Sequence, residues 1–189
     1  MHSGSISWLI LVFFGSELAL AMIKRSRHTS GTTGADRGSI VLLWVVISLA
    51  ITAAHSLAGY APGRLPFPPS STQAAAMILL VGGLAFRWWA VITLGKFFTV
   101  DVATHADHAL VDTGPYRLVR HPSYTGLLLA FFGFSLSLGN VFSVLAMMTP
   151  IVIALSYRMR VEEQALKQAL GPKYDAYCEK TKRLIPGIV

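Results

Sequence analysis

Residues 120–157 read RHPSYTGLLLAFFGFSLSLGNVFSVLAMMTPIVIALSY, and this stretch decides the fold. Its apolar runs, at 124–138 and 141–157, are separated by Gly139 and Asn140 alone, and a Gly-Asn pair favours a turn. The stretch therefore predicts a helical hairpin. At a rise of about 1.5 Å per residue the arms reach about 23–26 Å, so the hairpin spans a thinned bilayer or sits slightly inset.

The composition indicates a membrane protein. The chain has 189 residues, of which 53% are hydrophobic and 13% are charged, whereas soluble domains carry about 25% charge. Further apolar runs at 5–22, 39–57 and 74–94 approach the roughly 20 residues that cross a bilayer. Positive charges follow the first run instead of preceding it, so we expect a retained helix there, not a signal peptide. The prediction is an all-α, polytopic membrane bundle of about five transmembrane helices.

The distribution of Lys and Arg predicts the orientation of this bundle. The segments after the first, third and fifth runs carry most of the positive charge, and the opposite loops hold Arg64 alone. By the positive-inside rule, the N-terminus lies outside and the C-terminus lies in the cytoplasm. The net charge of +7 is then a membrane-surface effect that needs no nucleic acid. The polar segments 95–123 and 158–189 both fall on the cytoplasmic side.

We expect a single integrated domain. Residues 1–94 form an N-terminal three-helix transmembrane part, and residues 95–189 form a polar loop, the hairpin and cytoplasmic C-terminal helices. The single cysteine, Cys178, excludes an intramolecular disulfide.

Two charged residues lie within the apolar runs, Glu17 and Arg87. Isolated charges in lipid cost several kcal/mol, and the two residues have similar predicted depths. We expect them to pair with each other, and the alternative is that Arg87 extends toward an anionic ligand.

The segment 94–126 is too polar to span a membrane and too long for a simple connector. Pro122 suits the first turn of a helix, so the fourth helix should begin at or just after His121. Its free N–H groups could hold an anionic group beside Arg120 and His121. Alternatively, Arg120 and the nearby tyrosines form an interfacial belt. Small residues at helical spacing, Gly126, Ala130 and Gly133, permit close helix packing.

A second polar segment follows the fifth run. Arg158 and Glu162 are four residues apart and share a face if the helix continues beyond the membrane. They form either an ordinary surface pair or two ligand contacts directed back over the loop. Residues 173–183 resemble a basic amphipathic helix with solvated charges on anionic lipid.

Residues 108–126, HALVDTGPYRLVRHPSYTG, and 158–177, RMRVEEQALKQALGPKYDAY, together with the Leu-Ile-Pro at 184–186, resemble the isoprenylcysteine carboxyl methyltransferase family. These are integral membrane enzymes that use S-adenosylmethionine. The resemblance covers roughly 94–189, and the two blocks occur in the right order around the hairpin. We expect the chain to lack the extra N-terminal helices of the eukaryotic enzymes, and residues 101–107 match too poorly to receive a role.

The resemblance implies a cofactor-binding region on the cytoplasmic side. Arg158 corresponds to the arginine that holds the substrate carboxylate, and we take it as the candidate catalytic residue. Glu162 corresponds to the cofactor-contacting acid. The other implied cofactor contacts are His108, Leu110, Val111, Tyr116, His121, Pro122, Ser123 and Tyr124. The implied acceptor is a prenylated or otherwise lipophilic carboxylate that enters between the helices.

Three alternatives to carboxyl methylation are considered. N-methylation of a phospholipid or other amine would need a base, for which His121 or Glu162 could serve. An NADPH-dependent sterol-type reductase has a similar layout, but Pro122 argues for methyl transfer. A non-catalytic membrane protein retaining an old fold would bind neither cofactor. A metal site from His105, His108 and His121 lacks a supporting carboxylate or cysteine pattern, and no metal is expected.

Overall fold

The computed structural model describes residues 15, 34–95 and 110–187, and within them the regular elements are helical. The α-helices are α2 (Gly34–Leu57), α3 (Pro69–Leu94), α4 (Pro122–Ser137), α5 (Val141–Leu170) and α6 (Pro172–Lys180). Short 3-10 turns, η1 (Ala61–Gly63) and η3 (Gly114–Arg117), precede α3 and α4. The all-α prediction is confirmed. Apart from Gly15, the predicted first helix, with Glu17, lies outside the described residues.

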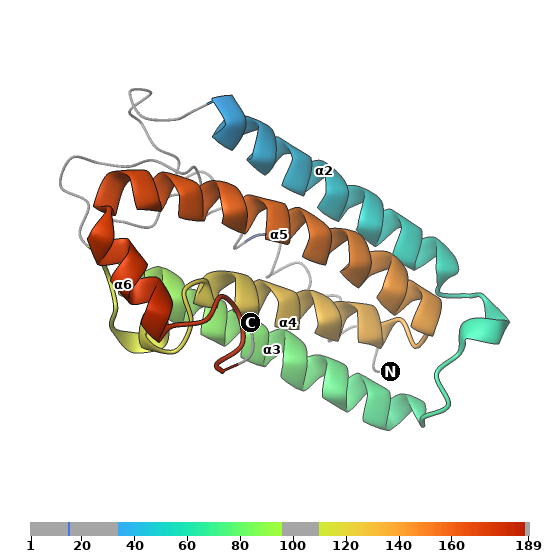
Figure 1. Cartoon of the computed structure of the whole chain (residues 1–189). Helices are drawn as coiled ribbons and strands as arrows, with labels where there is room; N and C mark the ends of the chain where they lie inside the picture. Colours follow the sequence, from blue (N-terminus) through green and yellow to red (C-terminus); the bar gives the residue numbers. More distant parts are fainter. Residues whose placement is uncertain (1–14, 16–33, 96–109, 188–189) are drawn as a thin grey trace.

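The four long helices lie side by side in the order α3, α4, α5 and α2 (Figure 1). The sequential hairpin α4–α5 thus forms the centre, and α2 and α3 flank it. A hydrophobic core joins the four helices, and its members from α4 and α5 include Leu127, Phe131, Met147, Ile151 and Leu155.

The hairpin prediction is confirmed at its turn. Gly139 has φ +66°, a left-handed conformation that glycine adopts without steric cost. Asn140 then caps α5, because its side-chain oxygen accepts from the backbone N–H of Phe142 at 2.9 Å. The fourth helix begins as predicted, with His121 as its N-cap residue and Pro122 in its first turn.

The fifth helix is longer than its apolar run, since α5 continues to Leu170. Residues 158–170 are polar but rich in strong helix formers such as Ala, Glu, Gln and Lys. Arg158 and Glu163 are buried in this extension, so tertiary contacts support it.

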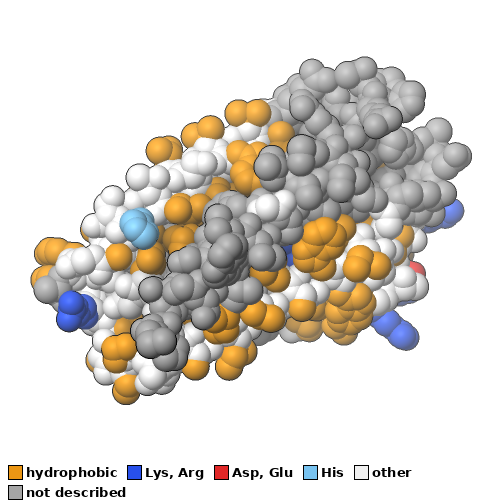
Figure 2. All heavy atoms as spheres, turned by 180° about the vertical axis from the view of Figure 1, so that it is seen from behind, with side chains coloured by type: hydrophobic (Ala, Val, Ile, Leu, Met, Phe, Trp, Pro, Cys, Tyr) orange, Lys and Arg blue, Asp and Glu red, His pale blue; other side chains and the backbone are white. Residues whose placement is uncertain are grey.

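Three described helical segments are long and apolar enough to cross a membrane: Gly38–Leu57, Pro69–Leu94 and Val141–Leu170. The 16-residue α4 is shorter than these segments, in keeping with the expected short hairpin arm. Exposed hydrophobic side chains cover much of the described surface, and the visible Lys and Arg lie mostly toward the ends of the molecule (Figure 2).

Glycines bring α3 and α4 into backbone contact. A Cβ atom added to Gly126 would lie 2.6 Å from the backbone nitrogen of Arg87, and one on Gly133 would lie 2.6 Å from that of Leu80. Ala130 is 1% exposed between them. The stripe of small residues therefore packs α4 against α3, as its spacing predicted.

Hydrogen bonds also fix both ends of the bundle. At the hairpin turn, Asn140 Nδ2 donates to the Tyr60 carbonyl at 2.7 Å, and Leu65 N donates to the Gly139 carbonyl at 3.0 Å. At the opposite end, Arg120 N donates to the Lys182 carbonyl at 2.7 Å and His121 N to the Arg183 carbonyl at 3.0 Å. The chain after α6 thereby returns to the start of α4.

Candidate active site

The segment before α4 contributes a buried tyrosine to the polar end of the bundle, the end that carries α6. Tyr116 lies in η3 and is 7% exposed. Burial, reinforced by the Glu162 carboxylate, raises the pKa of the Tyr116 phenol well above its usual value, so the phenol stays a neutral donor. The Tyr177 hydroxyl of α6 donates to the Tyr116 carbonyl at 2.6 Å and fixes this segment.

The start of α4 positions His121 and Tyr124. The His121 side chain is buried, and its ring stacks on the Tyr124 ring at a centroid distance of 5.5 Å. The Tyr124 hydroxyl donates to Glu162 Oε2 at 2.8 Å. His121 and Tyr124, both predicted site residues, thus contact each other. Tyr124 also binds Glu162, the predicted cofactor-contacting acid on α5.

Adjacent acids on α5 meet the two ring nitrogens of His121. Nδ1 lies 3.8 Å from Glu162 Oε2, and Nε2 lies 3.3 Å from Glu163 Oε1. The Glu162 side chain is 30% exposed, whereas that of Glu163 is 8% exposed. Glu162 therefore has an open side, and Glu163 is an internal anion.

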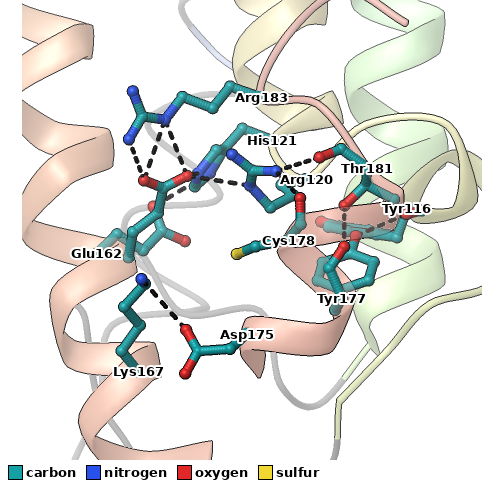
Figure 3. Close-up of polar contacts among 11 residues, drawn as sticks. Tyr116, Arg120, His121, Glu162, Lys167, Asp175, Tyr177, Cys178, Thr181 and Arg183 are labelled. Atoms are coloured by element: carbon teal, nitrogen blue, oxygen red, sulfur yellow. Dashed lines mark hydrogen bonds and ion pairs between the residues drawn. The ribbon is translucent and has the colours of Figure 1, made fainter. Parts of the chain in front are cut away.

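Two arginines neutralise Glu163. Arg120 Nε donates to Oε1 at 3.1 Å, and Arg183 donates to Oε2 from Nη2 at 2.6 Å and from Nε at 3.0 Å. Both arginines and His121 point toward this part of α5 in Figure 3. Arg120 Nη1 also donates to the backbone carbonyls of Cys178 and Thr181.

These contacts correct two sequence interpretations. Arg120 and Tyr116 do not form an interfacial belt, because Tyr116 is buried and Arg120 is bonded inside the cluster. Arg183 is not merely a solvated charge, since its hydrogen bonds to Glu163 raise the pKa of its guanidinium. The predicted amphipathic helix over 173–183 is the shorter α6, which ends at Lys180 and buries Tyr174 and Tyr177.

Arg158 is buried between α2 and α5 and is not a surface pair with Glu162. It is 3% exposed, and its Nη1 donates to Ser39 Oγ at 2.6 Å. It also interacts electrostatically with Tyr124. Arg158 therefore borders the same cluster from the α2 side.

Arg87 approaches the cluster from α3. Its Nη1 donates to Ser123 Oγ at 2.6 Å and to the Ser123 carbonyl at 3.3 Å. The arginine thus ties α3 to the first turn of α4. Its expected pairing with Glu17 remains a prediction, because Glu17 lies outside the described residues.

Six predicted site residues come together around the start of α4: Tyr116, His121, Ser123, Tyr124, Arg158 and Glu162. Pro122 is buried in the same first turn. Leu110 and Val111 are half-buried in the segment that leads to η3. His108, His105 and residues 101–107 lie outside the described residues.

Sequence reasoning missed Glu163 and Arg183 as members of this cluster. Both lie inside the blocks that carry the family resemblance or next to them, but helical spacing singled out Glu162 through Arg158. Glu163 could have been predicted from its position next to Glu162, in a helix that continues beyond its apolar run. Arg183 gave no such signal, because the return of the chain after α6 is a tertiary feature.

Within the described ranges there is no group of three His, Cys, Asp or Glu side chains that could hold a metal ion. The acids, arginines and tyrosines at this end suit an organic ligand. The Tyr174 hydroxyl is buried without a hydrogen-bond partner among the described residues, near Glu162, Glu163 and Arg120. A buried orphan donor beside acids and arginines fits a ligand that carries both hydrogen-bonding and charged groups.

Comparisons with known proteins agree with this architecture. Residues 76–168, from α3 to near the end of α5, match the isoprenylcysteine carboxyl methyltransferase family. The chain is 27% identical to a probable protein-S-isoprenylcysteine O-methyltransferase of Oryza sativa subsp. indica, over the whole of both chains. It is 34% identical to the protein-S-isoprenylcysteine O-methyltransferase of Schizosaccharomyces pombe over 60% of this chain and 49% of that protein.

A solved structure has a similar fold. It is that of the eukaryotic intramembrane Ras methyltransferase, isoprenylcysteine carboxyl methyltransferase, with a TM-score of 0.58 and 25% sequence identity. The likeness covers 82% of this chain and 51% of that one. The chain thus spans about half the length of the solved and the yeast relatives, and the full length of the rice relative.

The helical fold and its polar end define an integral membrane protein of the methyltransferase class. Within that class, the chain matches the isoprenylcysteine carboxyl methyltransferase family, as the sequence resemblance predicted. These comparisons favour carboxyl methylation over the amine methylation and sterol reduction that the sequence alone left open.

Proposed function

We propose that this protein methylates the carboxylate of a lipophilic acceptor, of the prenylcysteine type, with S-adenosylmethionine as methyl donor. The observation that carries the proposal is the junction at the start of α4. There His121 and Tyr124 meet Glu162 and Glu163 of α5, and Arg158 approaches from the α2 side.

The residues of this junction fit the donor. When bound, S-adenosylmethionine supplies a methyl group activated by a sulfonium, and it also carries an ammonium, a carboxylate and hydroxyl groups. Glu162 has an open side for a cationic group, and Tyr116 is a neutral phenol donor. Tyr174 adds a buried hydroxyl whose partner the described residues do not supply. Together with His121 and Tyr124, these residues would hold the cofactor.

A carboxylate acceptor places few chemical demands on the chain. It is ionised near neutral pH and needs no general base. The protein must orient and desolvate the carboxylate and exclude water from the site. Orientation alone can lower the activation barrier by several kcal/mol. Arg158 suits the orienting role, because a guanidinium binds a carboxylate in a planar fork and stays charged when buried.

The outer surface of the bundle suits contact with a lipophilic acceptor. The outer faces of α2 and α3 expose large apolar side chains such as Leu49, Ile78 and Ile92. An acceptor dissolved in the membrane would contact these apolar faces, and its carboxylate would have to reach the polar end of the bundle. This arrangement requires that the end holding α6 faces the cytoplasm, as the Lys and Arg distribution predicts.

Two assays with purified protein test the proposal. Labelled S-adenosylmethionine should bind, whereas NADPH should not. Methyl transfer to prenylcysteine analogues should yield a base-labile methyl ester, and analogues whose carboxylate is replaced by a neutral amide should remain unmodified. Binding of NADPH alone, or methylation of amine acceptors with no ester product, would overturn the proposal.

A further inference from the structure

The cluster contains an acid, Glu163, to which the proposed reaction assigns no task. Its side chain is 8% exposed, and its carboxylate is already balanced by two arginines. A buried carboxylate held by two arginines is too well satisfied to serve as a base or a ligand contact. Its third partner, His121, gives it a different role.

Glu163 decides which nitrogen of His121 carries the hydrogen. An ionised carboxylate accepts hydrogen bonds and cannot donate them. Since His121 Nε2 lies 3.3 Å from Glu163 Oε1, Nε2 must be the donor. In the neutral imidazole the hydrogen on Nε2 leaves Nδ1 as an acceptor. Arg120 and Arg183 already bind the Glu163 carboxylate, so Glu163 does not depend on His121 for its counter-charge.

Nδ1 of His121, now an acceptor, lies beside a second acceptor, the Glu162 carboxylate. Nδ1 is 3.8 Å from Glu162 Oε2, which also accepts from the Tyr124 hydroxyl at 2.8 Å. Two neighbouring acceptors call for a donor with more than one N–H, and an ammonium has three. The methyl donor of the proposed function carries such a group.

The chain around Glu163 is built to keep this arrangement fixed. Arg183 reaches the acid because the backbone N–H groups of Arg120 and His121 donate to the Lys182 and Arg183 carbonyls. Thr125 Oγ1 donates to the Leu184 carbonyl at 2.9 Å and extends the same contact. The segment 181–184 therefore holds Arg183 on Glu163 while it runs alongside His121.

We propose that Glu163 is a positioning residue: fixed by Arg120 and Arg183, it holds His121 with Nε2 protonated and presents Nδ1, paired with Glu162, as an acceptor for the ammonium of the methyl donor. This inference rests on the proposed function for the identity of the ligand. The state of the His121 ring does not depend on it.

The first test is therefore made without ligand. Nitrogen-15 spectra of the full-length protein with labelled histidine should show His121 with a hydrogen on Nε2 and none on Nδ1 at neutral pH. In Glu163→Gln the ring should lose this fixed state and show both tautomers, because an amide can donate as well as accept. A wild-type ring protonated on Nδ1 would overturn the inference, even if the protein proves to be a methyltransferase.

The second test is a double-mutant cycle on binding of S-adenosylhomocysteine, which retains the ammonium. Glu163→Gln should weaken binding about tenfold or more, the loss expected when a hydrogen bond to a charged group is disturbed. His121→Asn removes the atom that Glu163 contacts, so adding Glu163→Gln in that background should change binding less than about twofold. An equal loss in both backgrounds would show that Glu163 acts through general stability and would overturn the inference.

Two controls keep these outcomes separate. Lys167, on the same helix as Glu163, forms an exposed ion pair with Asp175 of α6, and Lys167→Gln should leave binding unchanged. Thermal unfolding of every variant identifies those that fail to fold, and Glu163→Asp, which keeps the charge, should restore part of the binding. If the wild type binds no S-adenosyl ligand, the proposed function fails and the ring spectra alone decide the inference.

Discussion

Arg158 is 3% exposed, and its bond to Ser39 Oγ contributes to the packing of α2 on α5 whether or not it also meets a substrate. A buried guanidinium needs such a partner, because an uncompensated charge costs several kcal/mol. A guanidinium has five donors, so a packing role and carboxylate binding do not exclude each other. The two roles can be separated by changing each partner in turn.

We expect Arg158→Ala to lower methyl transfer at least about a hundredfold, because the acceptor carboxylate loses its orientation, while S-adenosylmethionine still binds. Arg158→Lys should also be strongly impaired, since an ammonium cannot form the planar fork. The measurement is turnover beside cofactor binding. Ser39→Ala is the matched control, because it removes the hydroxyl bonded to Arg158 and keeps the guanidinium. Near-normal turnover of Arg158→Ala would disprove the assigned role.

Glu162 is the acid with an open side, and its replacement should act on the cofactor. We expect Glu162→Gln to weaken S-adenosylmethionine binding about tenfold or more, because a charge-assisted contact is lost. Titration calorimetry measures the change. Tyr124→Phe, which removes the 2.8 Å hydrogen bond to Glu162, should give a smaller loss, and Glu179→Gln on the exposed face of α6 should give none. Unaltered binding by Glu162→Gln would remove this acid from the site.

At the scale of elements, the contact of α3 with α4 depends on glycine. A Cβ on Gly83 would lie 2.5 Å from the Ala130 backbone nitrogen, whereas one on the neighbouring Gly82 meets nothing within 4 Å. Both residues lie in the interior of α3, where alanine is the better helix former. The pair therefore separates helix propensity from packing.

We expect Gly83→Ala to destabilise the protein by about 1–3 kcal/mol, because backbone atoms of α4 cannot yield to the new methyl group. Gly82→Ala should be neutral or stabilising by up to about 1 kcal/mol. Thermal unfolding in one detergent compares the two. A Gly83→Ala protein as stable as the wild type would mean that the helices are farther apart than described.

The hairpin turn depends on Asn140, which caps α5 and binds the Tyr60 carbonyl. We expect Asn140→Ala to cost about 1–3 kcal/mol, the sum of a lost helix cap and a lost hydrogen bond to the Tyr60 carbonyl. Thr52→Ala, which removes an exposed hydroxyl bonded within α2, is the control. Equal unfolding temperatures for the two variants would contradict the role of Asn140.

At the scale of the whole molecule, the two ends of the bundle differ. One end holds α6 and the polar cluster, and the other holds η1 and the hairpin turn (Figure 1). The positive-inside rule predicts that the α6 end faces the cytoplasm. This orientation decides which compartment supplies a water-soluble cofactor.

Cysteine labelling tests the orientation, and the chain contains a single cysteine to remove, Cys178. In a Cys178→Ser background, Ser70→Cys at the start of α3 should react in intact cells with an impermeant maleimide. Glu179→Cys on α6 should react only after the membrane is opened. Both replaced residues are exposed, so access to the side chain does not limit either reaction. The reverse pattern would invert the predicted topology.

Much of this architecture was predictable because its determinants are local. The Gly139-Asn140 turn, the start of α4 at Pro122 and the small-residue stripe follow from backbone sterics and helical spacing. The end of α5 at Leu170 was not predictable, because hydropathy indicates where the chain leaves the lipid and not where a helix ends. The choice between a surface pair and a buried Arg158 likewise depended on α2, which is far away in sequence.

The sequence by itself determined the membrane environment, the apolar helices, the hairpin and the family resemblance, because these follow from composition, periodicity and contiguous motifs. The tertiary structure alone decided that Glu163 rather than Glu162 is the enclosed acid, and that Arg183 returns after α6 to bind it. Adjacent residues on a helix point about 100° apart. The packing of other elements against α5 therefore decides which of the two acids is enclosed. This packing cannot be predicted from the spacing of residues along the chain.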